Sequence, residues 1–141
     1  MDIVTFRRAK SINDFNILRK IRNTGFEYLT NHSKYLSLID QYKFYLKKNE
    51  YSIFILTIKK DIGYLLLKEN DKKYFITIVL TPNYRGKGIA KLVIDYFKNY
   101  YKTITAVINK NNKNSLNLFI KCGFQLVLEN NENLIYEYEK K

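Results

Sequence analysis

The segment 81-TPNYRGKGIAKL-92 concentrates conformational freedom and positive charge in one place. It contains Pro82, the only proline of the chain, and two of the five glycines, which lie beside Arg85 and Lys87. Glycine lets the backbone adopt positive φ angles and lets a ligand approach it closely. An apolar run follows at once, so we predict a turn that leads into a helix, whose first N–H groups have no backbone partner. Such a helix start, with basic side chains beside it, is typical of an anion-binding site.

The glycine spacing excludes two common phosphate-binding motifs. Gly86 and Gly88 do not lead into the GK[ST] ending of a Walker loop. The pattern G-x-G-x-x-G is also absent, and no βαβ unit precedes the segment, which excludes a dinucleotide fingerprint. Taken alone, the segment could also be a plain strand-to-helix turn whose glycines only relieve backbone strain. The rest of the chain has to decide between these interpretations.

Hydrophobic periodicity predicts an α/β fold with a mixed sheet, in the order β-α-α-β-β-β-α-β-α-β-β, as one domain over residues 1–141. We expect the strands of residues 51–80 to form an antiparallel meander. The predicted strands cover 2–9, 51–58, 62–69, 73–80, 103–108, 124–129 and 134–139. The first predicted helix starts at Ser11 or Asn13. Three further helices are predicted over residues 35–46, 89–100 and 111–123. In the third helix we expect one buried face made of Ile89, Val93, Tyr96, Phe97 and Tyr100.

Composition narrows the functional class. The chain has 46% hydrophobic and 27% charged residues and a net charge of +12, so we expect a folded protein whose surface attracts acidic ligands. Only five of the 25 basic residues are arginines and the lysines are spread out, so we expect solvated lysines and no nucleic-acid partner. No apolar run approaches the roughly 20 residues of a membrane span. We expect no secretory signal and, with Cys122 as the single cysteine, a cytoplasmic protein without a disulfide.

Two linked motifs identify a family resemblance. The segment 80-LTPNYRGKGIAKLV-93 resembles the pyrophosphate-binding signature of the GNAT superfamily of acyl-CoA N-acyltransferases, with Arg85, Gly88 and Ala90 at its core positions. About twenty residues later, 112-NKNSLNLFIKCGF-124 resembles the second motif of the family, N-x-x-[AS]-x-x-L-Y-x-K-x-G-F. The predicted element order is that of the family over essentially the whole chain. The resemblance implies an N-acetyltransferase that uses acetyl-CoA, needs no metal, and acts as a monomer or homodimer.

The resemblance also implies roles for particular residues. Ile78 would offer its backbone N–H to the thioester carbonyl, and Leu80 would pair through its backbone with the pantetheine arm. The pyrophosphate would be wrapped by Arg85, Gly86, Lys87, Gly88, Ile89 and Ala90. In the second motif Asn112, Ser115 and Phe119 would contact the cofactor, although Asn112 could equally serve only as a helix cap.

One position departs from the family pattern. The tyrosine that commonly protonates the departing thiolate is replaced by Phe119, which has no hydroxyl. The carboxylate that some members carry on the fourth strand is also missing from 73–80. The general acid and base therefore stay unassigned. A water chain, a group of the substrate or another tyrosine could serve, and the candidate tyrosines are Tyr64, Tyr74 and Tyr136. Cys122 is expected to pack in a helix end and to take no part in transfer.

The acceptor is less well defined. On the acceptor side the candidates are Asn23, the carboxylates Glu27 and Asp40 for amine recognition, and His32, which could be a base or a solvated loop residue. Residues 20–46 weakly resemble members that acetylate nucleotide-linked amino sugars, through Arg22 and Asn23 and an aromatic second helix. We expect a small-molecule amine acceptor. The alternatives are a protein or peptide amine, or a CoA-binding module without turnover.

Overall fold

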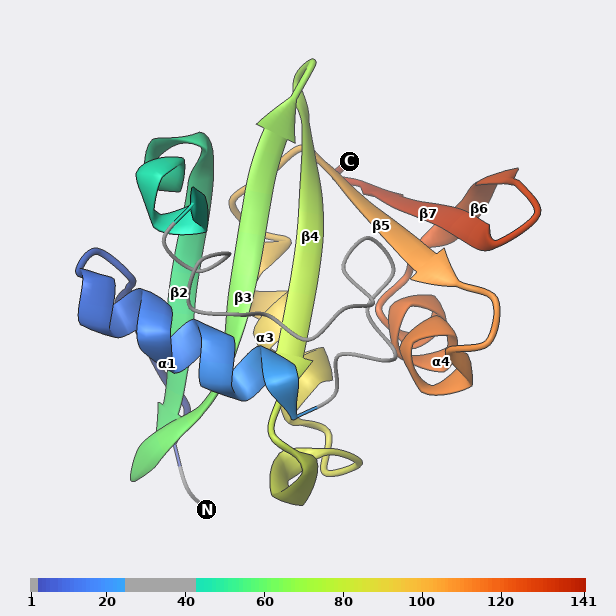
Figure 1. Cartoon of the computed structure of the whole chain (residues 1–141). Helices are drawn as coiled ribbons and strands as arrows, with labels where there is room; N and C mark the ends of the chain where they lie inside the picture. The colour runs from blue at the N-terminus through green and yellow to red at the C-terminus, as the bar shows by residue number, and fades with distance from the viewer. Residues whose placement is uncertain (1–2, 25–42) are drawn as a thin grey trace.

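Seven strands form one mixed sheet in the computed structural model, which describes residues 3–24 and 43–141 (Figure 1). Their order across the sheet is β1-β2-β3-β4-β5-β7-β6. The strands β4 and β5 are parallel, and the other five neighbouring pairs are antiparallel. The bounds are β1 (Thr5–Arg8), β2 (Tyr51–Ile58), β3 (Lys60–Asn70), β4 (Lys73–Leu80), β5 (Thr103–Asn109), β6 (Gln125–Glu129) and β7 (Asn133–Glu139). The predicted meander and mixed sheet are confirmed.

Helices cover both faces of this sheet. In the view of Figure 1, α1 (Ile12–Asn23) crosses in front of the strands and α3 (Ile89–Phe97) lies behind them. The helix α4 (Lys113–Lys121) precedes the β6–β7 hairpin, and short 3₁₀ turns occupy Lys48–Glu50 and Pro82–Tyr84. Of the helix predicted over 35–46, residues 43–46 are helical and the remainder lies outside the described residues. In the described parts of the chain, no helix is long and apolar enough to cross a bilayer.

The sheet separates two apolar cores. On one side, Phe15, Leu18 and Ile21 of α1 pack with residues of β2, β3 and β4, among them Val79. On the other side, α3 and α4 cover the sheet, and the buried set includes Phe119 of α4. Burying one large apolar side chain contributes about 1.5–3 kcal/mol. Packing against the sheet therefore holds the helices in place. It also fixes the positions at which α3 and α4 begin.

The buried face of α3 differs from the predicted one. Val93, Ile94 and Phe97 are buried, whereas Tyr96 is 45% exposed and Tyr100 is 63% exposed. The predicted stripe omitted Ile94 and extended the helical period through Tyr100, although the helix ends at Phe97. Because Tyr100 follows the helix end, helical spacing does not apply to it. A tyrosine also tolerates exposure, since its hydroxyl is polar.

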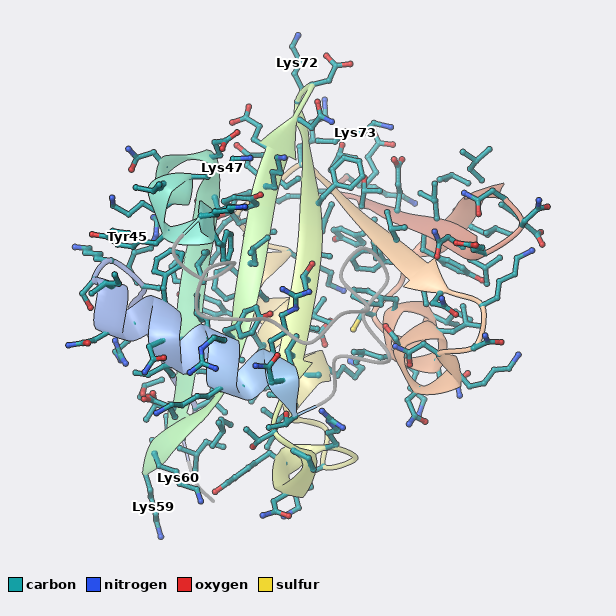
Figure 2. All side chains as sticks on the ribbon, in the orientation of Figure 1. Tyr45, Lys47, Lys59, Lys60, Lys72 and Lys73 are labelled. Atoms are coloured by element: carbon teal, nitrogen blue, oxygen red, sulfur yellow. The ribbon has the colours of Figure 1, made fainter. Side chains whose placement is uncertain are left out.

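Lysines mark both hairpin tips of the meander. Lys59 and Lys60 lie at the β2–β3 turn, and Lys72 and Lys73 at the β3–β4 turn, with all four residues exposed. Figure 2 shows these two lysine pairs at opposite ends of the molecule. They form no single basic patch, which agrees with the interpretation of the lysines as solvated surface residues.

The start of α1 is fixed by a reciprocal cap. The Ser11 hydroxyl accepts a hydrogen bond from the Asp14 backbone N–H, and the Asp14 carboxylate accepts from the Ser11 N–H. The guanidinium of Arg7 on β1 donates to the same carboxylate at 2.6 Å. Burial opposes the charged form of Asp14, but the hydrogen bonds from Arg7 and from the Lys10 and Ser11 N–H groups outweigh it and lower its pKa to about 2. Ser11, not Asn13, is therefore the cap.

We expect Asp14→Asn to lower the free energy of unfolding by about 1–2 kcal/mol at pH 7, because a charged hydrogen bond is lost. The folded pKa of about 2 lies below the unfolded value of 3.8. The contribution is therefore complete above pH 3.8 and is lost as the pH falls through 2. Urea unfolding of both proteins between pH 2 and pH 7 should show their difference shrinking below about pH 4. A matched Asp71→Asn variant, at an exposed hairpin carboxylate, should show no such convergence; a pH-independent difference for Asp14→Asn would contradict the linkage.

Candidate active site

The strands β4 and β5 separate along their length. Their parallel pairing covers only Tyr74 with Ile104 and Phe75 with Thr105, although β4 continues to Leu80 and β5 to Asn109. Figure 1 shows the two strands close together near the β3–β4 turn and diverging toward their carboxyl ends. Over its last five residues, then, the edge of β4 that faces β5 has no ladder partner in that strand.

The register of the meander determines which backbone groups lie on this open edge. The Thr81 N–H donates to the Ile62 carbonyl at 2.8 Å, so these two residues form a hydrogen-bonded antiparallel pair. Hydrogen-bonded and non-hydrogen-bonded pairs alternate in an antiparallel ladder. Leu80 and Ile78 are therefore non-bonded partners of β3, and their N–H and C=O groups point toward β5. These are the two residues that the sequence analysis assigned to cofactor pairing.

A close approach between β3 and β4 fixes the end of this edge. A Cβ atom added at Gly63 would lie 2.3 Å from the Val79 carbonyl oxygen and 2.7 Å from the Leu80 side chain. Only glycine fits there without displacing the backbone. Sequence analysis did not single out Gly63. An isolated glycine inside the strand 62-IGYLLLKE-69 was the available signal, because it marks a bulge or a close backbone approach.

The turn after β4 is held by Arg85. Its Nε donates to the Leu80 carbonyl oxygen at 2.9 Å, which closes the 3₁₀ turn of Pro82–Tyr84 against the strand end. Gly86 and Gly88 follow with φ angles of +72° and +80°. A Cβ atom at either glycine would meet no atom of the described chain within 4 Å. The glycines thus supply left-handed backbone, and the space beside them is open to a ligand.

The first turn of α3 faces this space without a side-chain cap. Gly88 is the N-cap, and within residues 3–24 and 43–141 no side chain caps the first N–H groups, which belong to residues such as Ile89 and Ala90. The first turn contains no acidic residue. The Lys87 ammonium lies 5.6 Å from the Tyr84 ring centroid, beside the same turn. Free N–H groups, the positive end of the helix dipole and basic side chains therefore meet in one place, which suits an anion.

The second motif forms α4 as predicted. The Asn112 side-chain oxygen accepts a hydrogen bond from the Ser115 backbone N–H at 3.1 Å, so the capping role of Asn112 is observed. Phe119 is only 4% exposed, and its ring centroid lies 5.0 Å from that of Phe124. At most a small part of its ring is therefore accessible to a ligand.

The acceptor-side candidates are only partly described. Asn23 is the last residue of α1 and is half-buried. Glu27, His32 and Asp40 lie outside the described residues. Across residues 3–24 and 43–141, no group of three or more His, Cys, Asp or Glu side chains is arranged to hold a metal ion.

The three candidate tyrosines lie in different surroundings. Tyr64 is buried under α1, and burial raises its pKa to about 12 despite the nearby charge of Arg22. Tyr74 is the first residue of β4 that pairs with β5, and its ring lies 4.6 Å from that of Tyr101. Tyr136 is half-buried on β7, opposite Ala106. The fold therefore does not bring the three together as one catalytic group.

Cys122 is buried at the end of α4. Burial raises the pKa of its thiol to about 11, and the negative charge of Asp95 adds to this effect. A thiol with such a pKa is almost entirely protonated at neutral pH, and the thiolate is the nucleophilic form. The predicted packing role of this side chain is confirmed by its burial.

Comparison with known proteins connects this geometry to a family. The acetyltransferase (GNAT) family model matches residues 15–124. Among curated protein sequences, none matches the chain. A domain from Methanocaldococcus jannaschii DSM 2661 aligns with a TM-score of 0.86 at 22% identity, covering 99% of this chain and 100% of that one. PaiA N-acetyltransferase from Thermoplasma acidophilum, solved with coenzyme A, gives 0.79 at 16% identity over 98% and 99%. Spermidine N-acetyltransferase SpeG from Vibrio cholerae gives 0.75 at 17% identity over 96% and 93%.

The structural matches show a shared fold, because their sequence identities are low. The family match is more specific, since it includes both the turn before α3 and the capped helix α4. It spans most of the chain and the whole of the diverging β4–β5 region. The chain belongs to the acetyltransferase (GNAT) family.

Proposed function

We propose that this protein transfers an acetyl group from acetyl-CoA to the primary amine of a small molecule, by direct attack of the amine. The observation that carries this proposal is the divergence of β4 from β5, which leaves the outward backbone groups of Ile78 and Leu80 without a partner in β5. An extended ligand arm that contains amide groups can pair with such an edge as an added strand would. Acetyl-CoA has such an arm and supplies the acetyl group as a thioester.

The anionic part of the cosubstrate would bind at the start of α3. The N–H groups of Ile89 and Ala90 and the positive charge of Lys87 converge where Gly86 and Gly88 leave the backbone accessible. Arg85 serves this site in a different way, because its Nε already donates to Leu80. Its remaining guanidinium donors can contact a phosphate while that hydrogen bond holds the turn in place.

The two β4 residues would have separate tasks. The Leu80 carbonyl accepts from Arg85, so the Leu80 N–H is the group left for pairing with the pantetheine arm. The Ile78 N–H, two residues earlier on the same edge, would donate to the thioester carbonyl oxygen. A fixed backbone donor at that position stabilises the negative charge that develops on the oxygen during transfer. In α4, Asn112 and Ser115 are proposed as further cofactor contacts beside their capping hydrogen bond.

Charge favours a neutral or anionic acceptor. The chain carries a net charge of +12, which repels a polycation and attracts a ligand with phosphate groups. A nucleotide-linked amino sugar has one primary amine and two phosphates and so fits this surface. The spermidine enzyme shares the fold at low identity, and that similarity does not carry its acceptor over. Asn23, Glu27 and His32 stay our candidates for acceptor binding.

The proton route is the open part of the chemistry. An alkyl ammonium group with a pKa of about 10.4 has to lose a proton before it attacks. Tyr64 is unsuited to accept that proton because it is buried and its pKa of about 12 keeps it protonated at neutral pH. We propose that water or a group of the acceptor removes the proton. The departing thiolate would take up a proton from water, because Phe119 has none to give.

A second candidate function is CoA binding without turnover. The specific observation in its favour is Phe119, which stands where the family commonly has a tyrosine and is almost fully buried. A protein or peptide amine is the alternative acceptor within the enzyme reading. An assay of free thiol release, with acetyl-CoA and a panel of an amino-sugar nucleotide, amino acids, a polyamine and a basic peptide, separates the three. Thiol release with any of them supports the enzyme, and release only with the peptide replaces the small-molecule acceptor.

We expect Gly88→Ala to lower acetyl-CoA affinity at least tenfold, because its Cβ would occupy the space where a phosphate approaches the backbone. The side chain meets no described protein atom, so a loss of affinity beyond strain reports on the ligand. Gly123→Ala is the matched control, since Gly123 has a φ of +88° at the far end of α4. Both variants should lose similar thermal stability, and only Gly88→Ala should lose binding in calorimetric titration. Retention of affinity within twofold would place the cosubstrate elsewhere.

We expect Cys122→Ser to retain turnover, because direct attack requires no acyl-enzyme and the thiol is buried and protonated. In the folded native protein this thiol should also react with a disulfide reagent far more slowly than in urea. Intact-mass measurement after mixing with acetyl-CoA should show no acetylated cysteine. An acetyl group on Cys122, or loss of turnover in a folded Cys122→Ser variant, would refute direct transfer.

We expect Phe119→Tyr to bind acetyl-CoA within about twofold of the native affinity and to raise turnover or leave it unchanged. General acid catalysis contributes about 10² to 10⁴ in rate, but a thiolate with a pKa near 8.5 needs little of it. Phe124→Tyr adds the same hydroxyl to the adjacent buried ring and controls for its folding cost. If the native protein binds acetyl-CoA, acetylates nothing in the panel and gains transfer only as Phe119→Tyr, the binding-module function is the correct one.

A further inference from the structure

A pocket of about 320 Å³ opens on the α3 side of the sheet, at the β1 edge. It is lined by six aromatic residues and one arginine, which come from β1, β2, the end of α3 and the segment that follows it. A volume near 300 Å³ lies at the lower end of the range for small-molecule pockets. It therefore suits one ring system better than an extended chain.

The bottom of the pocket is formed by buried aromatic rings, and its walls by more exposed ones. Phe54 and Phe97 pack with ring centroids 5.0 Å apart, and Phe97 is only 5% exposed. Phe6 lies 5.2 Å from Tyr96 and 5.3 Å from Phe97. Tyr96 in turn lies 5.3 Å from Tyr100. Tyr96 and Tyr100 are the two tyrosines that were predicted to be in the core, and their exposed faces are available to a planar ring, which stacks favourably on aromatic side chains.

Among the described residues that line the pocket, Arg8 is the one with a charged side chain. Its guanidinium carbon lies 5.6 Å from the Phe54 ring centroid, and its Nη2 donates to the Tyr51 carbonyl at 3.2 Å. The neighbouring Arg7 pairs with Asp14 and Asp61, but Arg8 forms no ion pair with a carboxylate in the described parts of the chain. A guanidinium has five N–H donors in a planar fork that matches carboxylate and phosphate groups. Arg8 thus brings an uncompensated positive charge and several donors to an aromatic pocket.

We propose that this pocket binds a planar aromatic ring that carries an anionic group. The ring would stack on the exposed faces of the tyrosines, and the anion would bind Arg8. A cation is excluded by the charge of Arg8 and by the net charge of +12, although aromatic cages elsewhere bind cations. A purely apolar ligand would leave the Arg8 donors unused. The ring and the anion together account for both parts of the lining.

The pocket is separate from the proposed acetyl-CoA site. Tyr96 lies eight residues after Gly88 along α3, which is a rise of about 12 Å. Across the order of the strands the two sites also differ. The pocket lies at β1 and β2, whereas the proposed acetyl-CoA site lies between β4 and β5. The proposal does not depend on acetyl transfer, so it can fail or hold independently of the proposed function.

The absence of tryptophan provides a clean measurement, because an indole ligand can be excited at wavelengths where the 13 tyrosines absorb little. Indole-3-acetate, neutral indole-3-acetamide and cationic tryptamine share one ring and differ in charge. We expect fluorescence anisotropy to show saturable binding, about fivefold tighter for the acetate than for the amide and weakest for tryptamine, as one exposed ion pair would give. Indoxyl phosphate tests whether phosphate or carboxylate is preferred, and preference for either anion over the amide supports the proposal.

Variants of the pocket assign the interaction. Arg8→Gln should reduce the acetate affinity to that of the amide, while Lys10→Gln, which removes an equal charge two residues away, should preserve the acetate's advantage. Tyr100→Ala should weaken all three ligands, since it removes a wall and no charge. The proposal is overturned if no ligand saturates below 10 mM (roughly the weakest useful small-molecule affinity), if tryptamine binds most tightly, or if Arg8→Gln and Lys10→Gln behave alike. Displacement of the indole by acetyl-CoA would place it in the cofactor site and would also overturn the proposal.

Discussion

The parting of two parallel strands is the constraint on which the rest of the structure depends. The β4–β5 ladder contains only two residue pairs, and beyond them the outward groups of Ile78 and Leu80 have no partner in β5. A backbone edge that lacks a partner costs free energy when water is excluded, so it needs a ligand or solvent to complete it. The two cores fix the position of β4, because α1 packs on one of its faces and α3 and α4 pack on the other.

The predicted fold followed from strong local patterns. The alternation in β2, β3 and β4 and the glycine turn before α3 gave the element order correctly, because each pattern depends on neighbours in sequence. The buried face of α3 was predicted less well. Tyr96 and Tyr100 fit the helical spacing of apolar residues, but the helix ends at Phe97. Which face a helix end buries depends on contacts with β1 and β2, and these strands lie far away in sequence.

For the candidate site, the sequence predicted the turn before α3 and the start of α4, but not the contacts within them. Leu80 was expected to offer its backbone to a ligand, yet its carbonyl already accepts from Arg85, a contact between side chain and backbone that no spacing rule predicts. The clash that restricts position 63 to glycine also arises across two strands and becomes visible only in three dimensions. Phe119 was recognised from its place in a motif, whereas its burial comes from packing on Phe124.

The uncapped start of α3 affects the local unfolding of that helix. A helix end without side-chain acceptors is the part of the helix that frays first, because its N–H groups lose little when they turn to water. An anion bound there takes the place of the missing cap. Binding of the anion and ordering of the first turn of α3 are therefore coupled. The first turn of α3 should then exchange its amide hydrogens at a rate set by ligand concentration, while the capped start of α4 exchanges at a rate of its own.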